Sequence, residues 1–126
     1  MGSENFESTF TSLKSVFASH LKKLAIKTDK ANEYTLAGKV PSPFPQHKGQ
    51  PLAFGMVKIG RAYVSFHLVP LYMNDALKGS MSPALKKRMQ GKACFNFKTA
   101  PEPETIDELK KLTAVSFKDW AAKGWL

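Results

Sequence analysis

Residues 52–69 read LAFGMVKIGRAYVSFHLV. This stretch contains two apolar runs, residues 52–59 and 62–69, which are separated only by Gly60 and Arg61. Two runs of this length joined by a tight turn with a glycine are typical of an antiparallel β-hairpin. We therefore expect the centre of the chain to be strand, with the remaining elements assembled around this hairpin.

Strand and loop signals continue on both sides of the hairpin. EYTLAGKV, residues 33–40, and KACFNFK, residues 92–98, are short strand candidates. Between the first of them and the hairpin lies PSPFPQHKGQP, residues 41–51, which is predicted to be a surface loop because prolines interrupt regular structure. The chain is thus expected to contribute four strands.

A short helix is predicted between the hairpin and the last strand, after Pro70 ends the hairpin. Ser82 is a good N-cap and Pro83 suits the first turn, while Gly91 follows the segment ALKKRMQ, residues 84–90. The basic residues of this segment would then lie beside the last strand.

Amphipathic helices are predicted at both ends of the chain. Apolar residues recur at intervals of three and four from Asn5 to about Leu24, and a second such pattern follows Pro103. The fold class is therefore α+β. We expect a two-layer sandwich with a mostly antiparallel four-stranded sheet, the long N- and C-terminal helices on one face, and the short helix before the last strand. The length of 126 residues and the 43% hydrophobic content fit a single domain over residues 1–126.

The opposite face of the sheet is predicted to be open and to carry any binding site. Because side chains alternate across a strand, Val64, Phe66 and Leu68 should meet the helices while their neighbours face outward. The outward set, with one basic residue of the short helix, forms the candidate ligand-binding site. Its members are Tyr63, Ser65, His67, Arg88, Lys92, Cys94, Asn96 and Lys98.

Two members of this set have reactive side chains, and each leaves two interpretations open. His67 titrates near neutral pH and is able to bind a metal, yet a lone histidine on a strand is more often a hydrogen-bonded surface residue. Cys94, the single cysteine, is either a thiol whose pKa is lowered by Lys92 or a small buried apolar residue. We assign no catalytic residue and no metal ligand.

Positive charge is concentrated in the middle of the chain. Of the net charge of +9, residues 34–98 account for all, with 10 basic residues and 1 acidic residue. A field of one sign attracts anions, although a merely solvated surface has the same composition. We expect an anion-attracting patch beside the open face, centred on Lys86, Lys87, Arg88, Lys92 and Lys98.

Motifs of the common enzyme classes are absent from the sequence. There is no P-loop, dinucleotide-binding glycine motif, GxSxG, HExxH or EF-hand loop, and the acidic residues are too scattered for a carboxylate pair. A single cysteine excludes an intrachain disulfide and favours a reducing compartment. With neither a signal-peptide pattern nor 18 consecutive apolar residues, the expectation is a cytoplasmic protein that is not an enzyme and has no membrane partner.

The stretch FGMVKIGRAYVSFHLVPLYMNDALKGSMSPALKKRMQGKACFNFK, residues 54–98, resembles the signature of the YdhG-like family of small bacterial proteins, a domain of unknown function. The hairpin, the Pro-Leu-Tyr after it and the Gly-Lys-x-Cys-Phe-x-Phe strand carry the resemblance. It implies a sheet flanked by terminal helices and related in shape to frataxin, and an intracellular iron-chaperone role described for at least one member. Iron enters as a cofactor only through this resemblance.

Three functional hypotheses follow. The preferred one is a non-catalytic binding module, a monomer or weak dimer, that holds an anionic small molecule or an acidic protein partner. The alternative is a frataxin-like iron chaperone, which would rely on carboxylates of the first helix and strand, because hard cations prefer oxygen ligands. The least favoured is a nucleic-acid-binding protein, since aromatic residues interleaved with basic ones stack bases in some sheets but no RNP motif is present.

Overall fold

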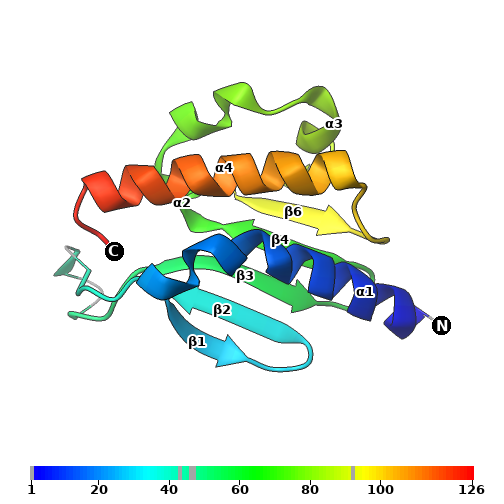
Figure 1. Cartoon of the computed structure of the whole chain (residues 1–126), viewed down its shortest axis with the longest axis horizontal. Coiled ribbons are helices and arrows are strands. Elements are labelled where there is room, and N and C mark those ends of the chain that lie inside the picture. The colour runs from blue at the N-terminus through cyan, green and yellow to red at the C-terminus, as the bar shows by residue number, and fades with distance from the viewer. Residues whose placement is uncertain (1, 43, 46–47, 92) are drawn as a thin grey trace.

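The protein is described from a computed structural model that covers residues 2–42, 44–45, 48–91 and 93–126. Its centre is one antiparallel sheet of six strands in the order β1-β2-β3-β4-β6-β5 (Figure 1). The strands are β1 (Ala25–Asp29), β2 (Glu33–Ala37), β3 (Ala53–Ile59), β4 (Val64–Leu68), β5 (Met89–Gln90) and β6 (Cys94–Phe97). The predicted α+β class is confirmed.

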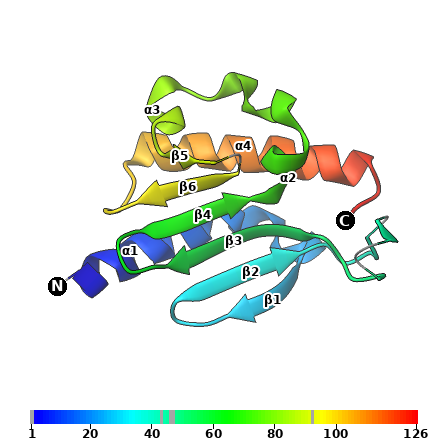
Figure 2. The same ribbon diagram turned by 180° about the vertical axis from the view of Figure 1, so that it is seen from behind.

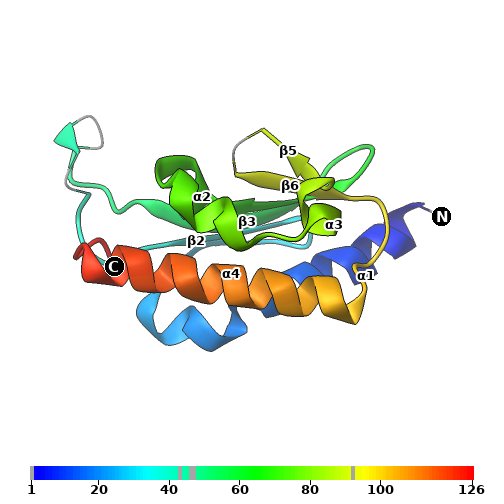
Figure 3. The ribbon, with the colours of Figure 1, turned by 90° about the horizontal axis from the view of Figure 1, so that it is seen from above.

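The long helices α1 and α4 cover one face of this sheet, and α2 flanks the end of the other face (Figure 2, Figure 3). Figure 3 shows α1 and α4 on the same side of the strands, as the sequence predicts. The helical elements are α1 (Gly2–Lys14), the 3-10 helix η1 (Ser15–Lys23), α2 (Val69–Met73), the 3-10 helix η3 (Asp75–Ser80), α3 (Pro83–Lys86) and α4 (Pro103–Ala122).

The β3–β4 hairpin forms as predicted. Ile59 lies opposite Val64 and Gly55 opposite Leu68, and the amide of Gly60 donates a hydrogen bond of 2.9 Å to the carbonyl of Tyr63. The turn is longer than the sequence suggested, because β4 begins at Val64 rather than at residue 62.

The sheet has six strands where the sequence predicted four. The apolar and polar residues of β1, AIKTD, do not alternate strictly, and the strand has no strongly apolar face. Its pairing with β2 therefore decides its structure more than its own sequence pattern does. The strand β5 is only two residues long and falls in the segment expected to be helical, because α3 already ends at Lys86. Pro70, expected to end β4, lies instead in the first turn of α2.

The first helix also differs from its prediction. The apolar repeat indicated one helix to about Leu24, whereas regular α-helix stops at Lys14 and nine residues of 3-10 helix follow. The 3-10 turn is tighter, with three residues per turn. Both parts still bury apolar residues against the sheet, since Leu13 and Phe17 are fully buried.

Aromatic side chains fill the space between the sheet and the helices. Phe17 of η1 stacks on Phe66 of β4 with ring centroids 5.1 Å apart, and Trp120 of α4 meets Phe54 of β3 edge-on at 5.6 Å. Phe54 reaches the core because the β2–β3 register shifts beside it, as at a β-bulge. A Cβ atom at Gly55 would overlap the Phe17 ring, so this glycine makes room for it.

The short helix α3 is fixed to α4 through its N-cap. The side chain of Ser82 accepts a hydrogen bond from the amide of Leu85 at 3.2 Å and donates one of 2.7 Å to Oε1 of Glu108. The Ser82 amide also donates to Oε2 of the same carboxylate at 2.6 Å. The predicted cap is confirmed, and it holds α3 at the end of the sheet where α4 begins (Figure 2).

Candidate functional site

The face of the sheet opposite α1 and α4, here called the open face, carries two rows of side chains that cross β3, β4 and β6. In one row Met56 lies opposite His67, and His67 lies opposite Cys94. In the other row Lys58 lies opposite Ser65, and Ser65 lies opposite Asn96. Figure 2 shows these three strands from this side, with α1 and α4 behind them. The open face is defined by Met56, Lys58, Ser65, His67, Cys94 and Asn96.

The predicted alternation places four of the candidate residues together on this face. Ser65, His67, Cys94 and Asn96 are half-buried, whereas the residues between them on the same strands are buried in the core. The buried neighbours are Val64, Phe66, Leu68, Phe95 and Phe97.

Hydrogen bonds join three of these side chains. The hydroxyl of Ser65 donates to Oδ1 of Asn96 at 3.3 Å, and the thiol of Cys94 donates to the same oxygen at 3.5 Å. Burial raises the pKa of the Cys94 thiol, and a hydrogen bond with Ser65 opposes this only in part. Burial therefore favours a protonated thiol at neutral pH over a low-pKa thiolate, which was the other interpretation of Cys94.

Burial also sets the protonation of His67. Loss of hydration disfavours the imidazolium form and lowers the pKa of His67 below its usual 6.5. The ring is consequently neutral at neutral pH and has a nitrogen lone pair free to accept a hydrogen bond or a metal ion.

Protonation of His67 should make the stability of the protein depend on pH. The unfolded chain binds a proton below pH 6.5, whereas the folded protein binds it only at lower pH, so stability is full above pH 6.5 and falls as the pH drops below it. We expect His67→Gln to flatten this fall in urea unfolding followed from about pH 8 to about pH 5. Burial also lowers the pKa of His20. His20→Gln, measured over the same pH range, therefore shows how much of the fall in stability comes from that histidine. An unchanged slope in His67→Gln would show that His67 stays solvated.

The other predicted site residues lie at the margins of this group. Tyr63 precedes β4 in the turn and is exposed, and Lys98 is exposed one residue beyond β6. The carbonyl of Arg88 accepts a hydrogen bond of 2.9 Å from the amide of Asn96, and the Arg88 guanidinium lies 5.7 Å from the ring centroid of Phe97. Lys92 lies outside the described residues.

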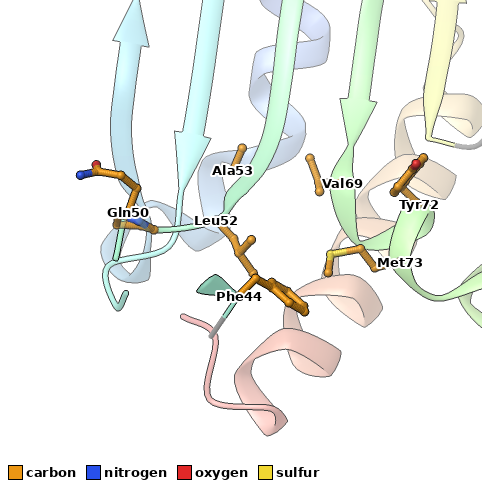
Figure 4. A pocket seen from close by; sticks show the side chains of 8 residues that line it. Phe44, Gln50, Leu52, Ala53, Val69, Tyr72 and Met73 are labelled. Atoms are coloured by element: carbon orange, nitrogen blue, oxygen red, sulfur yellow. The ribbon is translucent and has the colours of Figure 1, made fainter. Parts of the chain in front are cut away.

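A cavity that the sequence did not suggest lies at one end of the open face. It has a volume of about 500 Å³ and is mostly apolar, and we call it the apolar groove. Its lining residues are Phe44, Gln50, Pro51, Leu52, Ala53, Val69, Tyr72 and Met73. In Figure 4 Ala53, at the start of β3, and Val69, at the start of α2, stand above Leu52, Phe44 and Met73.

The apolar groove combines segments that are distant in the sequence. Phe44 comes from the proline-rich loop, Ala53 from β3, and Tyr72 and Met73 from α2. Tyr72 and Met73 are 65% and 37% exposed, which is high for large apolar side chains. The sequence signals for this groove are the phenylalanine among the prolines of the predicted loop and the Pro-Leu-Tyr-Met run after β4.

Two findings bear on metal binding and membrane insertion. Within the described part of the chain, no three histidine, cysteine, aspartate or glutamate side chains come close enough to hold a metal ion. In the same part of the chain, no helix combines the length and apolar character needed to cross a membrane.

Comparison with known proteins gave no relative: no protein-family model, curated protein or solved structure matches this chain.

Proposed function

We propose that the protein is a non-catalytic binding module that holds an acidic protein partner on its open face. The observation that carries this proposal is the arrangement of that face, which has an apolar groove at one end and exposed basic side chains at the other. Such a face suits a partner segment that combines an apolar anchor with negative charge.

The basic side chains gather at the end of the sheet opposite the groove. Lys58 lies on the open face near the β3–β4 turn, and Lys98 follows β6 at the same end. Exposed Lys86 and Lys87 belong to the α3 region, which lies at this end as well (Figure 2). We call Lys58, Lys86, Lys87 and Lys98 the basic end. Glu33 of β2 lies opposite Lys58, so the four lysines leave this end with an excess of positive charge rather than with one sign alone. Such an excess raises the encounter rate with an anionic partner.

The size of the face favours a polypeptide over a small anion. From Ala53 at the groove to Lys58 the strand rises by about 17 Å, at about 3.3 Å per residue. A small anion would reach only one of the two features. An extended segment whose acidic residues lie about five positions from an aromatic or aliphatic residue, at about 3.3 Å per residue, would reach both the groove and the basic end. Buried apolar anchors supply most of the affinity in protein interfaces, and rim charges add specificity and rate.

The first helix and strand give less support to iron delivery. The carboxylate of Asp29 on β1 pairs with the amine of Lys14 on α1 at 3.5 Å. A carboxylate already facing a lysine is a poor iron ligand. We also propose that the fold is frataxin-like, which is supported by terminal helices packed on one face of an antiparallel sheet (Figure 3).

Fluorescence anisotropy with a labelled acidic peptide containing one phenylalanine tests the proposal. We expect binding that weakens with salt, and a loss of about 10-fold in Lys58→Ala/Lys98→Ala, because each exposed ion pair contributes up to about 1 kcal/mol. Met73→Ala should weaken binding through the groove. Lys118→Ala, an exposed lysine on α4, is the matched control and should leave the affinity unchanged.

Two further probes separate the competing functions. A peptide with glutamine in place of its acidic residues should not bind. A labelled single-stranded oligonucleotide that binds with a steep salt dependence, while the acidic peptide does not bind, would overturn the proposal in favour of nucleic-acid binding. Binding of free citrate or phosphate at the basic end, with no contribution from Met73, would favour a small anion instead.

A further inference from the structure

The cross-strand row of the open face brings together three different metal-binding side chains. Met56 of β3, His67 of β4 and Cys94 of β6 are directly opposite one another in neighbouring strands. Directly opposite residues on one face of an antiparallel pair have Cβ atoms about 4.5–5.5 Å apart. A thioether, an imidazole and a thiol therefore lie within reach of a single ion placed above His67.

The orientation of all three side chains follows from burial. Val57, the next residue after Met56, is fully buried in the core, so Met56 points to the opposite side of the sheet. The buried residues that flank His67 and Cys94 give the same orientation. All three side chains are half-buried, so the row is partly shielded from water yet open from one side.

We infer that Met56, His67 and Cys94 form a three-coordinate binding site for a soft monovalent cation, Cu(I). Thiolate and thioether sulfur are soft ligands that select Cu(I), and imidazole binds copper as well. Ca²⁺, Mg²⁺ and other hard cations prefer oxygen ligands, which this row does not offer. Among the described residues, histidine, cysteine and carboxylate side chains alone form no group of three that could hold a metal ion. In this row a methionine is the third ligand.

Proton release accompanies binding at this row. An imidazole binds an ion through a ring nitrogen that carries no proton. The Cys94 thiol, which donates a hydrogen bond to Asn96, gives its proton to solvent as the Cu–S bond forms, with no change in the oxidation state of copper or sulfur. Binding therefore breaks the hydrogen bond from Cys94 to Asn96 and leaves the Ser65–Asn96 bond in place.

This inference is independent of the acidic partner. The row lies between the apolar groove and the basic end and uses neither of them. If the protein bound Cu(I) but no acidic peptide, this inference would stand and the proposed function would fail. If it bound the acidic peptide but no Cu(I), the proposed function would stand and this inference would fail.

Anaerobic competition with the Cu(I) chelator bathocuproine disulfonate, with copper alone as the ligand, tests the site. We expect one Cu(I) per chain. Cys94→Ser should weaken Cu(I) binding by at least about 100-fold, and Met56→Leu and His67→Gln by about 10-fold each, since even residues outside the coordination sphere change metal affinity by about 10–100-fold.

Matched controls of the same residue types lie elsewhere in the protein. Met73→Leu at the apolar groove and His20→Gln on η1 should leave Cu(I) affinity unchanged. As a second readout, redox-inert Ag(I) should shift the ring nitrogen resonances of His67 and not those of His20. Retention of affinity in Cys94→Ser, equal losses in the two control variants, or binding of Zn²⁺ as tight as that of Cu(I) would each overturn the inference.

Discussion

Replacement of Trp120 by alanine is expected to lower the free energy of unfolding by about 3–5 kcal/mol, the usual cost of removing a fully buried large aromatic side chain. Trp120 has no exposed surface and meets both Phe54 of β3 and Trp125 of the C-terminal segment edge-on, at 5.6 and 5.7 Å. Its loss would leave a cavity between α4 and the sheet, which rigid surroundings fill only in part. Urea unfolding followed by circular dichroism measures the change.

The phenylalanine variant shows what part of this cost is packing. Among the described residues the indole N–H of Trp120 is buried without a hydrogen-bond partner, so Trp120→Phe removes no hydrogen bond and relieves an unsatisfied donor. We expect this variant to be clearly more stable than Trp120→Ala. Equal losses in the two variants would mean that the ring itself contributes little and that our account of the core is wrong.

Gly55→Val is expected to destabilise the protein by about 1–3 kcal/mol or more, as overpacking of a filled core does. A Cβ atom at this position would overlap Cζ and Cε1 of Phe17, and it would lie 3.2 Å from the carbonyl oxygen of His67. Phe17 stacks on Phe66, so its ring has little room to move away. Thermal unfolding should show the loss as a lower midpoint.

Gly79→Ala is the control position for this prediction. A Cβ atom at Gly79 would meet no heavy atom within 4 Å, so the substitution should leave the unfolding midpoint nearly unchanged. If Gly55→Val unfolded at the same temperature as Gly79→Ala, the close contact between Gly55 and Phe17 would not exist in solution.

The parts of the fold that local patterns decide were predicted correctly. The β3–β4 hairpin and the outward direction of Ser65, His67, Cys94 and Asn96 follow from the alternation of apolar residues with period two, which burial enforces. The N-cap at Ser82 was also predicted, because its side chain bonds to an amide only three residues away.

The parts that depend on partners distant in the sequence were missed. The strands β1 and β5 owe their structure to the strands they pair with, and the sequence of either segment alone favours no strand. The apolar groove requires Phe44, Ala53 and Met73 to meet, and no periodicity within one segment reports on that.

The protonation of Cys94 depends on packing that the sequence does not report. Neighbouring basic residues would lower the pKa of the thiol and burial would raise it, and both interpretations were open from the sequence. Burial of the thiol against the sheet is the larger effect, and it raises the pKa.

The two outer strands of the sheet determine whether another polypeptide is able to extend it. The strand β1 bears Lys27, and its pairing with β2 is irregular between Ile26 and Thr28, while β5 at the far edge spans only two residues. Charged side chains, bulges and short length are the features by which edge strands resist intermolecular β-pairing. A growing fibril or a swapped strand would find no long, regular ladder of free amides at either edge.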